Sequence, residues 1–257
     1  MKGQILLSFD VEEFDIPLEY GYNIPMDEQI KIGKKGLDAL MPVLAAEDIR
    51  TTLFITANFA KHFPEEVHRL AEQHEIASHT YFHSTYENGD LLKSKQVLEA
   101  LTEQPVTGLR MPRMRQPDMA EVTEAGFLYD ASLNPTWIPG RYNNLKTPRL
   151  LHMEHGIYRV PASVSPNFRL PLFWLAFKNY PYAFFKKLCL DCLKADGYLC
   201  LYFHPWEFVD ITTYNLPRYV KRLCGLRLLE RLQHLIADLK KEGDFITMNS
   251  FIQMNVC

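Results

Sequence analysis

The stretch Gln4-Ile5-Leu6-Leu7-Ser8-Phe9-Asp10-Val11-Glu12 joins an apolar run to two carboxylates near the N-terminus. Residues 4–9 have the pattern of a strand that is buried on both faces of a parallel sheet. Side chains two positions apart on an extended segment share a face, so Asp10 and Glu12 can converge on one site while Glu13 turns away. We therefore expect a functional site at the carboxyl end of this strand.

A strand followed by a helix recurs along the chain. Further strands are predicted at residues 51–56, 75–78, 106–110, 127–130, 198–203 and 244–248, with a strand or hairpin at 151–161. Helices are predicted at residues 30–44, 60–73, 91–101, 118–125, 223–241 and 170–194, the last interrupted at Pro181. This alternation favours an α/β fold with a parallel sheet, closed or wound, and helices outside it. With no repeat or linker in view, residues 1–257 are expected to form a single domain.

Two histidines follow the predicted strand at 75–78, in His79-Thr80-Tyr81-Phe82-His83. Imidazoles four positions apart beside a strand end can point toward one centre, and neutral imidazole is a common metal ligand. Two imidazoles and one carboxylate form the ligand set of a hydrolytic zinc site that keeps a position open for water. Glu12 is the candidate third ligand, with Glu13 and Asp15 as alternatives.

Other polar side chains also follow predicted strands, at the rim where parallel α/β barrels carry their chemistry. Asp10 is placed to take a proton from an attacking water, and Arg110 either fixes Asp10 or lies on a surface loop. His204 either gives a proton to a leaving group or is a core histidine. Asp130 could orient His204 or Arg110.

The composition excludes several functional classes. A net charge of −3, a pI near 6.3 and the lack of a long basic run disfavour nucleic acid as a partner. The five cysteines lie in apolar surroundings in the last third, which is typical of reduced thiols, and Cys189-Leu190-Asp191-Cys192 has no second pair for a zinc site.

The location of the protein is predicted from two observations. The first strand reaches candidate catalytic residues by position 10, which leaves no room for a signal peptide and favours the cytoplasm. No apolar run approaches the roughly 20 residues that a membrane-spanning helix needs. The aromatic, lysine-flanked segment 170–187 is either a peripheral membrane contact or a core helix. The oligomeric state is not indicated.

Five motifs stand in order along the chain: Ser-Phe-Asp-Val-Glu at 8–12, His-Thr-x-x-His at 79–83, Arg-x-Pro at 110–112, Asp-x-Ser-x-x-Pro at 130–135 and Leu-x-x-His at 201–204. In these motifs the chain resembles the NodB-type polysaccharide deacetylases, a family of metal-dependent carbohydrate N- and O-deacetylases. The resemblance implies a single distorted (β/α) barrel of seven strands.

The resemblance also implies roles for the site residues. Asp10 would be the general base and His204 the general acid, Arg110 would hold the base, and three metal ligands would be Glu12, His79 and His83. The first motif departs from the common one, in which adjacent aspartates stand, because Val11 occupies the second position. A minority branch that includes peptidoglycan-deacetylase-like and allantoinase-like enzymes also uses an Asp-x-acid arrangement.

The expected function is removal of an acetyl group from an N-acetylated sugar, with a cytoplasmic nucleotide- or lipid-linked glycan precursor as substrate. The cofactor is one divalent metal ion, zinc first, with cobalt, nickel or iron as alternatives. Trp137, Trp206 and Pro112 are candidate sugar contacts, although isolated tryptophans are more often core. The alternatives are hydrolysis of a non-sugar amide or cyclic imide and a catalytically silent carbohydrate-binding barrel.

Overall fold

The central strand β1 is hydrogen-bonded to three other strands, and the rest of the sheet extends from it. A computed structural model describes residues 2–256. The sheet order is β10-β1-β2-β3-β4-β5-β9-β8, and β11 pairs with the first half of β1. The strands span Gly3–Val11 (β1), Thr52–Ile55 (β2), Glu75–Ser78 (β3), Gly108–Leu109 (β4), Tyr129–Asp130 (β5), His152–Glu154 (β8), Ile157–Arg159 (β9), Tyr198–Phe203 (β10) and Gly243–Phe245 (β11).

From β10 to β9 in this order, each strand is parallel to the next, which gives an arc of seven parallel strands. β8 pairs antiparallel with β9 at the edge of this arc. The arc curls, and the segment after β9 bridges the gap to β10. There the amide of Ser163 donates to the carbonyl of Cys200 at 2.9 Å, and the Ser163 hydroxyl accepts from the Cys200 amide at 2.9 Å. The predicted α/β fold with a distorted seven-stranded barrel is confirmed.

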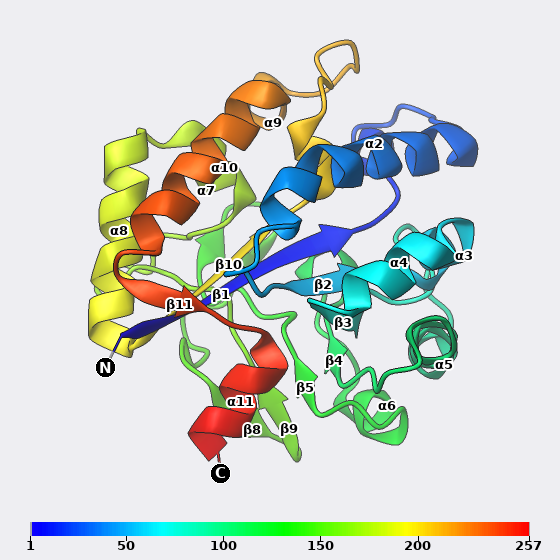
Figure 1. The fold of residues 1–257 in the computed structure, drawn as a ribbon, viewed down its shortest axis with the longest axis horizontal. Coiled ribbons are helices and arrows are strands. Elements are labelled where there is room, and N and C mark those ends of the chain that lie inside the picture. The colour runs from blue at the N-terminus through cyan, green and yellow to red at the C-terminus, as the bar shows by residue number, and fades with distance from the viewer. Residues whose placement is uncertain (1, 257) are drawn as a thin grey trace.

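Most helices flank the outside of the curled sheet (Figure 1). They span Ile16–Glu19 (α1), Met26–Leu44 (α2), Ala57–His62 (α3), Pro64–Ala71 (α4), Asp90–Thr102 (α5), Met119–Glu124 (α6), Trp174–Asn179 (α7), Tyr182–Asp196 (α8), Arg218–Lys221 (α9), Leu226–Leu239 (α10) and Met248–Val256 (α11). Short 3-10 turns lie at Pro112–Met114 and Pro205–Phe208, and the hairpin of β6 (Trp137–Ile138) and β7 (Tyr142–Asn143) stands apart from the sheet.

A small apolar cluster fills the inside of the curled sheet, and α11 covers one end of it. Met248, Phe251 and Ile252 of α11 join the inward-facing side chains of Leu6 and Phe54 in this cluster. The amide of Met248 donates to the Thr52 hydroxyl at the start of β2. The carboxyl ends of the strands therefore remain open on the opposite side, where the candidate site lies.

Two predicted elements differ from the structure, and one hairpin lies outside the predicted elements. The predicted helix at 60–73 is two helices, because Pro64 lacks the amide proton that would continue the first one. The predicted strand at 244–248 ends at Phe245, and the helix α11 that follows was not predicted. The β6–β7 hairpin lies between the strand predicted at 127–130 and the strand or hairpin predicted at 151–161, where no element was predicted.

The aromatic segment 170–187 contributes mainly to the core. Leu172, Phe177 and Phe185 are buried, and Lys178 is buried as well, whereas Phe184 remains 41% exposed. Within residues 2–256, no helix has the length and apolar character needed to cross a membrane. The core-helix alternative thus describes most of this segment.

Candidate active site

Three side chains converge at the carboxyl ends of β1 and β3. One carboxylate oxygen of Glu12, Oε2, lies 2.9 Å from Nε2 of His79 and 2.9 Å from Nε2 of His83. All three side chains are buried, and their ligand atoms lie within 4.8 Å of one another. The chain between the histidines turns at Thr80, whose φ of 65° lies in the left-handed region that non-glycine residues rarely occupy. The structure therefore brings the three predicted ligands together.

The second nitrogen of each imidazole has its own acceptor. Nδ1 of His79 donates to the backbone carbonyl of Arg110 at 2.7 Å, and Nδ1 of His83 lies 2.7 Å from Oδ1 of Asp15. These partners place a proton on each Nδ1 and turn the Nε2 lone pairs toward Glu12, as in histidine ligands of metal ions. Two lone pairs facing a carboxylate repel it unless a cation or a proton lies between them. The donor set thus fits a divalent metal ion.

The protonation of the metal-free chain supports this interpretation. Burial opposes the charged forms, but the carboxylates of Glu12 and Asp15 raise the pKa of His83 to about 10. Burial likewise raises the pKa of Glu12, but His83 and His204 hold it well below its usual value. Without metal, a proton on His83 supplies the positive charge that Glu12 requires.

The predicted base and its arginine form a buried ion pair. An Nη atom of Arg110 lies 2.5 Å from Oδ1 of Asp10 and also donates to the hydroxyl of Ser8 at 3.0 Å. The guanidinium lies over the ring of Phe54 at 4.0 Å from its centroid, so it is fixed on its flat side too. Arg110 therefore fixes the orientation of the Asp10 carboxylate.

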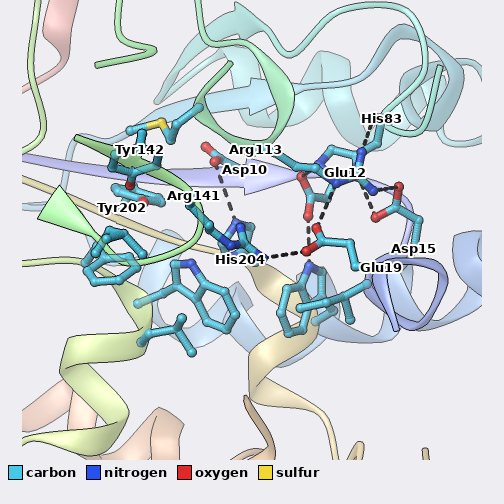
Figure 2. Close-up of a pocket in the computed structure, with 17 residues that line it drawn as sticks. Asp10, Glu12, Asp15, Glu19, His83, Arg113, Arg141, Tyr142, Tyr202 and His204 are labelled. Carbon is cyan, nitrogen blue, oxygen red and sulfur yellow. Dashed lines mark hydrogen bonds and ion pairs between the residues drawn. The ribbon is translucent and has the colours of Figure 1, made fainter. Parts of the chain in front are cut away.

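His204 follows β10 and faces the same cavity. Its Nε2 lies 3.8 Å from Oδ2 of Asp10, and Figure 2 shows this contact beside Glu12. Its Nδ1 lies 3.1 Å from Oε1 of Glu207, which also accepts the His204 amide at 2.9 Å. Burial lowers the pKa of His204, but the carboxylates of Glu12, Glu207 and Asp10 raise it above its usual value. Glu207 thus orients the imidazole and favours its charged form.

A lysine stands behind Glu207. The ammonium of Lys178, in α7, lies 2.8 Å from Oε2 of Glu207 and donates to the carbonyl of Val220 at 3.0 Å. Both Lys178 and Glu207 are completely buried. Burial raises the pKa of Glu207, but Lys178 and His204 lower it below its usual value. A fully buried carboxylate of this kind requires such a partner.

Asp130 has a different partner from those predicted. It stands opposite Arg159 in the β5–β9 register, 3.0 Å from its Nε, and accepts hydrogen bonds from Ser132. The Ser132 hydroxyl accepts the amide of Met111 at 2.7 Å. No hydrogen bond or ion pair joins Asp130 to His204 or Arg110 among the described residues. The expectation that Asp130 orients one of them is wrong, because β9 supplies a nearer cation.

The cavity above these groups is lined by both polar and apolar side chains (Figure 2): Asp10, Glu12, Asp15, Ile16, Glu19, His83, Arg113, Met114, Ile138, Arg141, Tyr142, Phe173, Trp174, Leu175, Tyr202, His204 and Trp206. Trp206, a predicted sugar contact, lines it, but its Nε1 donates to Oε1 of Glu12 at 2.9 Å. The other two predicted contacts do not line this cavity, since Pro112 is buried elsewhere and Trp137 is 58% exposed on β6.

The residues that sequence reasoning missed stand behind the reacting groups. The sequence indicates Asp15 only as an alternative metal ligand, whereas the structure places its carboxylate against Nδ1 of His83. Glu207 lies three positions after His204, a spacing at which a side chain returns to the backbone amide of a cap residue. A lysine within an apolar helix segment, as at Lys178, was the remaining signal of a buried charge pair.

Comparison with protein families gives a match over residues 24–128, to the model described as polysaccharide deacetylase. The matched range includes His79, His83 and Arg110, and it excludes Asp10 and His204. No curated protein sequence matches the chain.

Solved structures share the fold over almost the whole chain. A Mycobacterium smegmatis protein assigned as a polysaccharide deacetylase is 18% identical, with 98% of this chain and 90% of that chain covered at a TM-score of 0.65. A Pseudomonas aeruginosa PAO1 protein with the same assignment is 14% identical, with 97% of this chain and 89% of that chain covered at a TM-score of 0.67. The PuuE allantoinase is 17% identical, with 97% of this chain and 89% of that chain covered at a TM-score of 0.62.

Proposed function

We propose that this chain, which matches the polysaccharide deacetylase model over residues 24–128 and shares the fold of proteins with that assignment, removes the acetyl group of an N-acetylated sugar with the help of one divalent metal ion. The observation that carries the proposal is the convergence of Glu12, His79 and His83 beside a cavity that Glu12 and His83 line together with Asp10 and His204. Two imidazoles and a carboxylate suit zinc, and cobalt, nickel and iron accept the same ligands. Bound there, such an ion would polarise the acyl carbonyl and acidify an attacking water.

The side chains around the ligands divide the proton transfers between them. Asp10 accepts a proton from the attacking water, since Arg110 balances its charge and fixes its carboxylate. His204 gives a proton to the departing amine nitrogen, since Glu207 holds its ring and favours the charged form. The two groups line one cavity at 3.8 Å from each other, so both reach a substrate amide bound beside them.

Acetate release tests this function. The purified protein, loaded with zinc, cobalt, nickel or iron in turn, is incubated with N-acetylglucosamine oligomers and UDP-N-acetylglucosamine. Asp10→Asn should lower turnover by roughly 10²–10⁴-fold, the usual contribution of general base catalysis, and keep its metal. His79→Ala should lose both metal and turnover. Near-normal turnover of the Asp10→Asn protein would show that Asp10 is not the base.

A second candidate function is hydrolysis of a non-sugar amide or cyclic imide, which the fold shared with the PuuE allantoinase favours. Ring-opening of allantoin and of small cyclic imides is measured beside acetate release. Imide opening without acetate release would favour this second candidate. Metal binding with neither reaction would favour a carbohydrate-binding protein on a deacetylase fold.

A further inference from the structure

The active-site cavity continues into a groove with three arginines. Both hollows share Glu19, Arg113, Met114, Arg141 and Tyr142 as lining residues, and the groove adds Arg115, Gln116 and Asn144. Because the shared residues form a continuous lining, a ligand that reaches the reacting groups can extend over the arginines.

The positive charge of this groove exceeds the negative charge beside it. Arg113 lies 2.7 Å from one oxygen of Glu19, and Arg141 lies 2.6 Å from the other. Glu19 is the one acid among the described lining residues of the groove and is paired with both Arg113 and Arg141. Asp15, in the adjoining cavity, is a second partner of Arg113, so three arginines face two carboxylates. Arg115 is exposed and has no side-chain hydrogen bond or ion pair within residues 2–256. The whole chain carries a net charge of −3, so this positive excess is local.

Arg113 connects the groove to the metal ligands. Its guanidinium lies 2.7 Å from Asp15, the carboxylate that holds His83, and donates to the backbone carbonyl of His83 at 3.3 Å. Arg113 and Met114 have φ values of 58° and 54°, in the left-handed region that costs non-glycine residues conformational energy. The loop is therefore held in an unfavourable conformation that directs Arg113 into the cavity, next to the acyl-cleaving groups.

We propose that the groove lined by Arg113, Arg115 and Arg141 binds the phosphate or diphosphate of an acetylated glycosyl phosphate, whose acetamide reaches Asp10 and His204. This rests on the proposed deacetylase function and specifies its substrate class. Guanidinium groups match phosphate oxygens with paired hydrogen bonds, and several of them around one groove suit a multiply charged group. Nucleotide-linked and lipid-linked sugars share this diphosphate, and neutral glycan polymers lack it.

The first test measures binding without turnover. Inorganic pyrophosphate is titrated calorimetrically into the purified chain, into Arg115→Gln/Arg141→Gln and into the control Arg227→Gln, an exposed arginine of α10 outside both hollows. We expect the double variant to weaken binding at least tenfold and the control to match the unaltered protein. Equal binding in all three proteins would overturn the proposal.

The second test compares substrates. Acetate release is measured for N-acetylglucosamine, UDP-N-acetylglucosamine and N-acetylglucosamine linked by diphosphate to a short prenol. We expect kcat/KM at least tenfold higher for the diphosphates, and the ratio of charged to neutral substrate should fall about tenfold in Arg115→Gln/Arg141→Gln. A preference between the two diphosphates identifies the carrier. Equal kcat/KM for neutral and charged sugars would overturn the groove proposal and leave deacetylation standing.

The two proposals can fail separately. Pyrophosphate binding that depends on the arginines, combined with no acetate release from any sugar, would contradict the proposed function and support the anion site. Acetate release from neutral sugars, combined with arginine-independent pyrophosphate binding, would do the reverse.

Discussion

The proposed active site has a metal side and a proton-donor side, and the two are built differently. On the metal side, Glu12, His79 and His83 come from the ends of β1 and β3, within 71 positions of one another. On the proton-donor side, His204 ends β10 and depends on Glu207 and Lys178, the latter from a separate helix. Each side has a carboxylate behind a histidine, Asp15 on one and Glu207 on the other.

The difference lies in what balances the supporting carboxylate. Asp15 is paired with Arg113 at the cavity wall, where a ligand can approach. Glu207 is paired with Lys178, and both are inaccessible to solvent. The metal side can therefore respond to what binds in the cavity, whereas the donor side is fixed by the core. We expect mutations on the two sides to give different combinations of effects on metal content, turnover and stability.

The largest expected difference is between Glu12→Ala and His204→Ala. Glu12→Ala should lose the metal and with it all measurable acetate release, because it removes one of the three predicted ligands. His204→Ala should keep one metal per chain and lower kcat by roughly 10²–10⁴-fold. Metal content is measured by mass spectrometry after dialysis. If His204→Ala also lost its metal, His204 would belong to the metal side.

A smaller effect is expected from Glu207→Gln, which keeps the shape of the side chain and removes its charge. We expect kcat/KM to fall roughly 10–100-fold, as for other partners that orient reacting groups. The Glu207 carboxylate raises the pKa of His204, so its loss lowers that pKa and moves the alkaline limb of the pH–rate profile to lower pH.

The matched control is Glu207→Asp, which should restore part of the rate and keep the profile near that of the unaltered protein. An equal loss of rate in both variants, with an unshifted alkaline limb, would make Glu207 a purely structural residue.

Lys178→Met would leave the buried Glu207 carboxylate unpaired and should cost about 3–5 kcal/mol of unfolding free energy.

The smallest effect on catalysis is expected from Asp130→Asn. Asp130 contacts Arg159 and Ser132 and neither reacting group, so kcat/KM should change less than about tenfold. The lost charged interaction should reduce the unfolding free energy by roughly 1.5–3 kcal/mol, measured by urea denaturation. A loss of kcat/KM comparable to that of His204→Ala, with unchanged stability, would show that Asp130 takes part in catalysis.

The strands and reacting groups could be predicted because each is signalled locally. The apolar run before Asp10 defines β1, and a polar residue after such a run lies at the sheet edge wherever the strand pairs. The partners could not be predicted in this way, because the choice between Arg159 and Arg110 for Asp130 depends on strand register. Helix α11 was missed because its apolar residues continue directly from those of β11.

The central claim is that Glu12, His79 and His83 hold one metal ion, and X-ray absorption spectroscopy of the zinc-loaded protein tests it most directly. We predict two imidazole nitrogens at about 2.0–2.1 Å and oxygen donors completing the shell, with the imidazole scattering reduced in His79→Ala. A shell with sulfur donors, or one that is unchanged in both Glu12→Ala and His79→Ala, would contradict the claim.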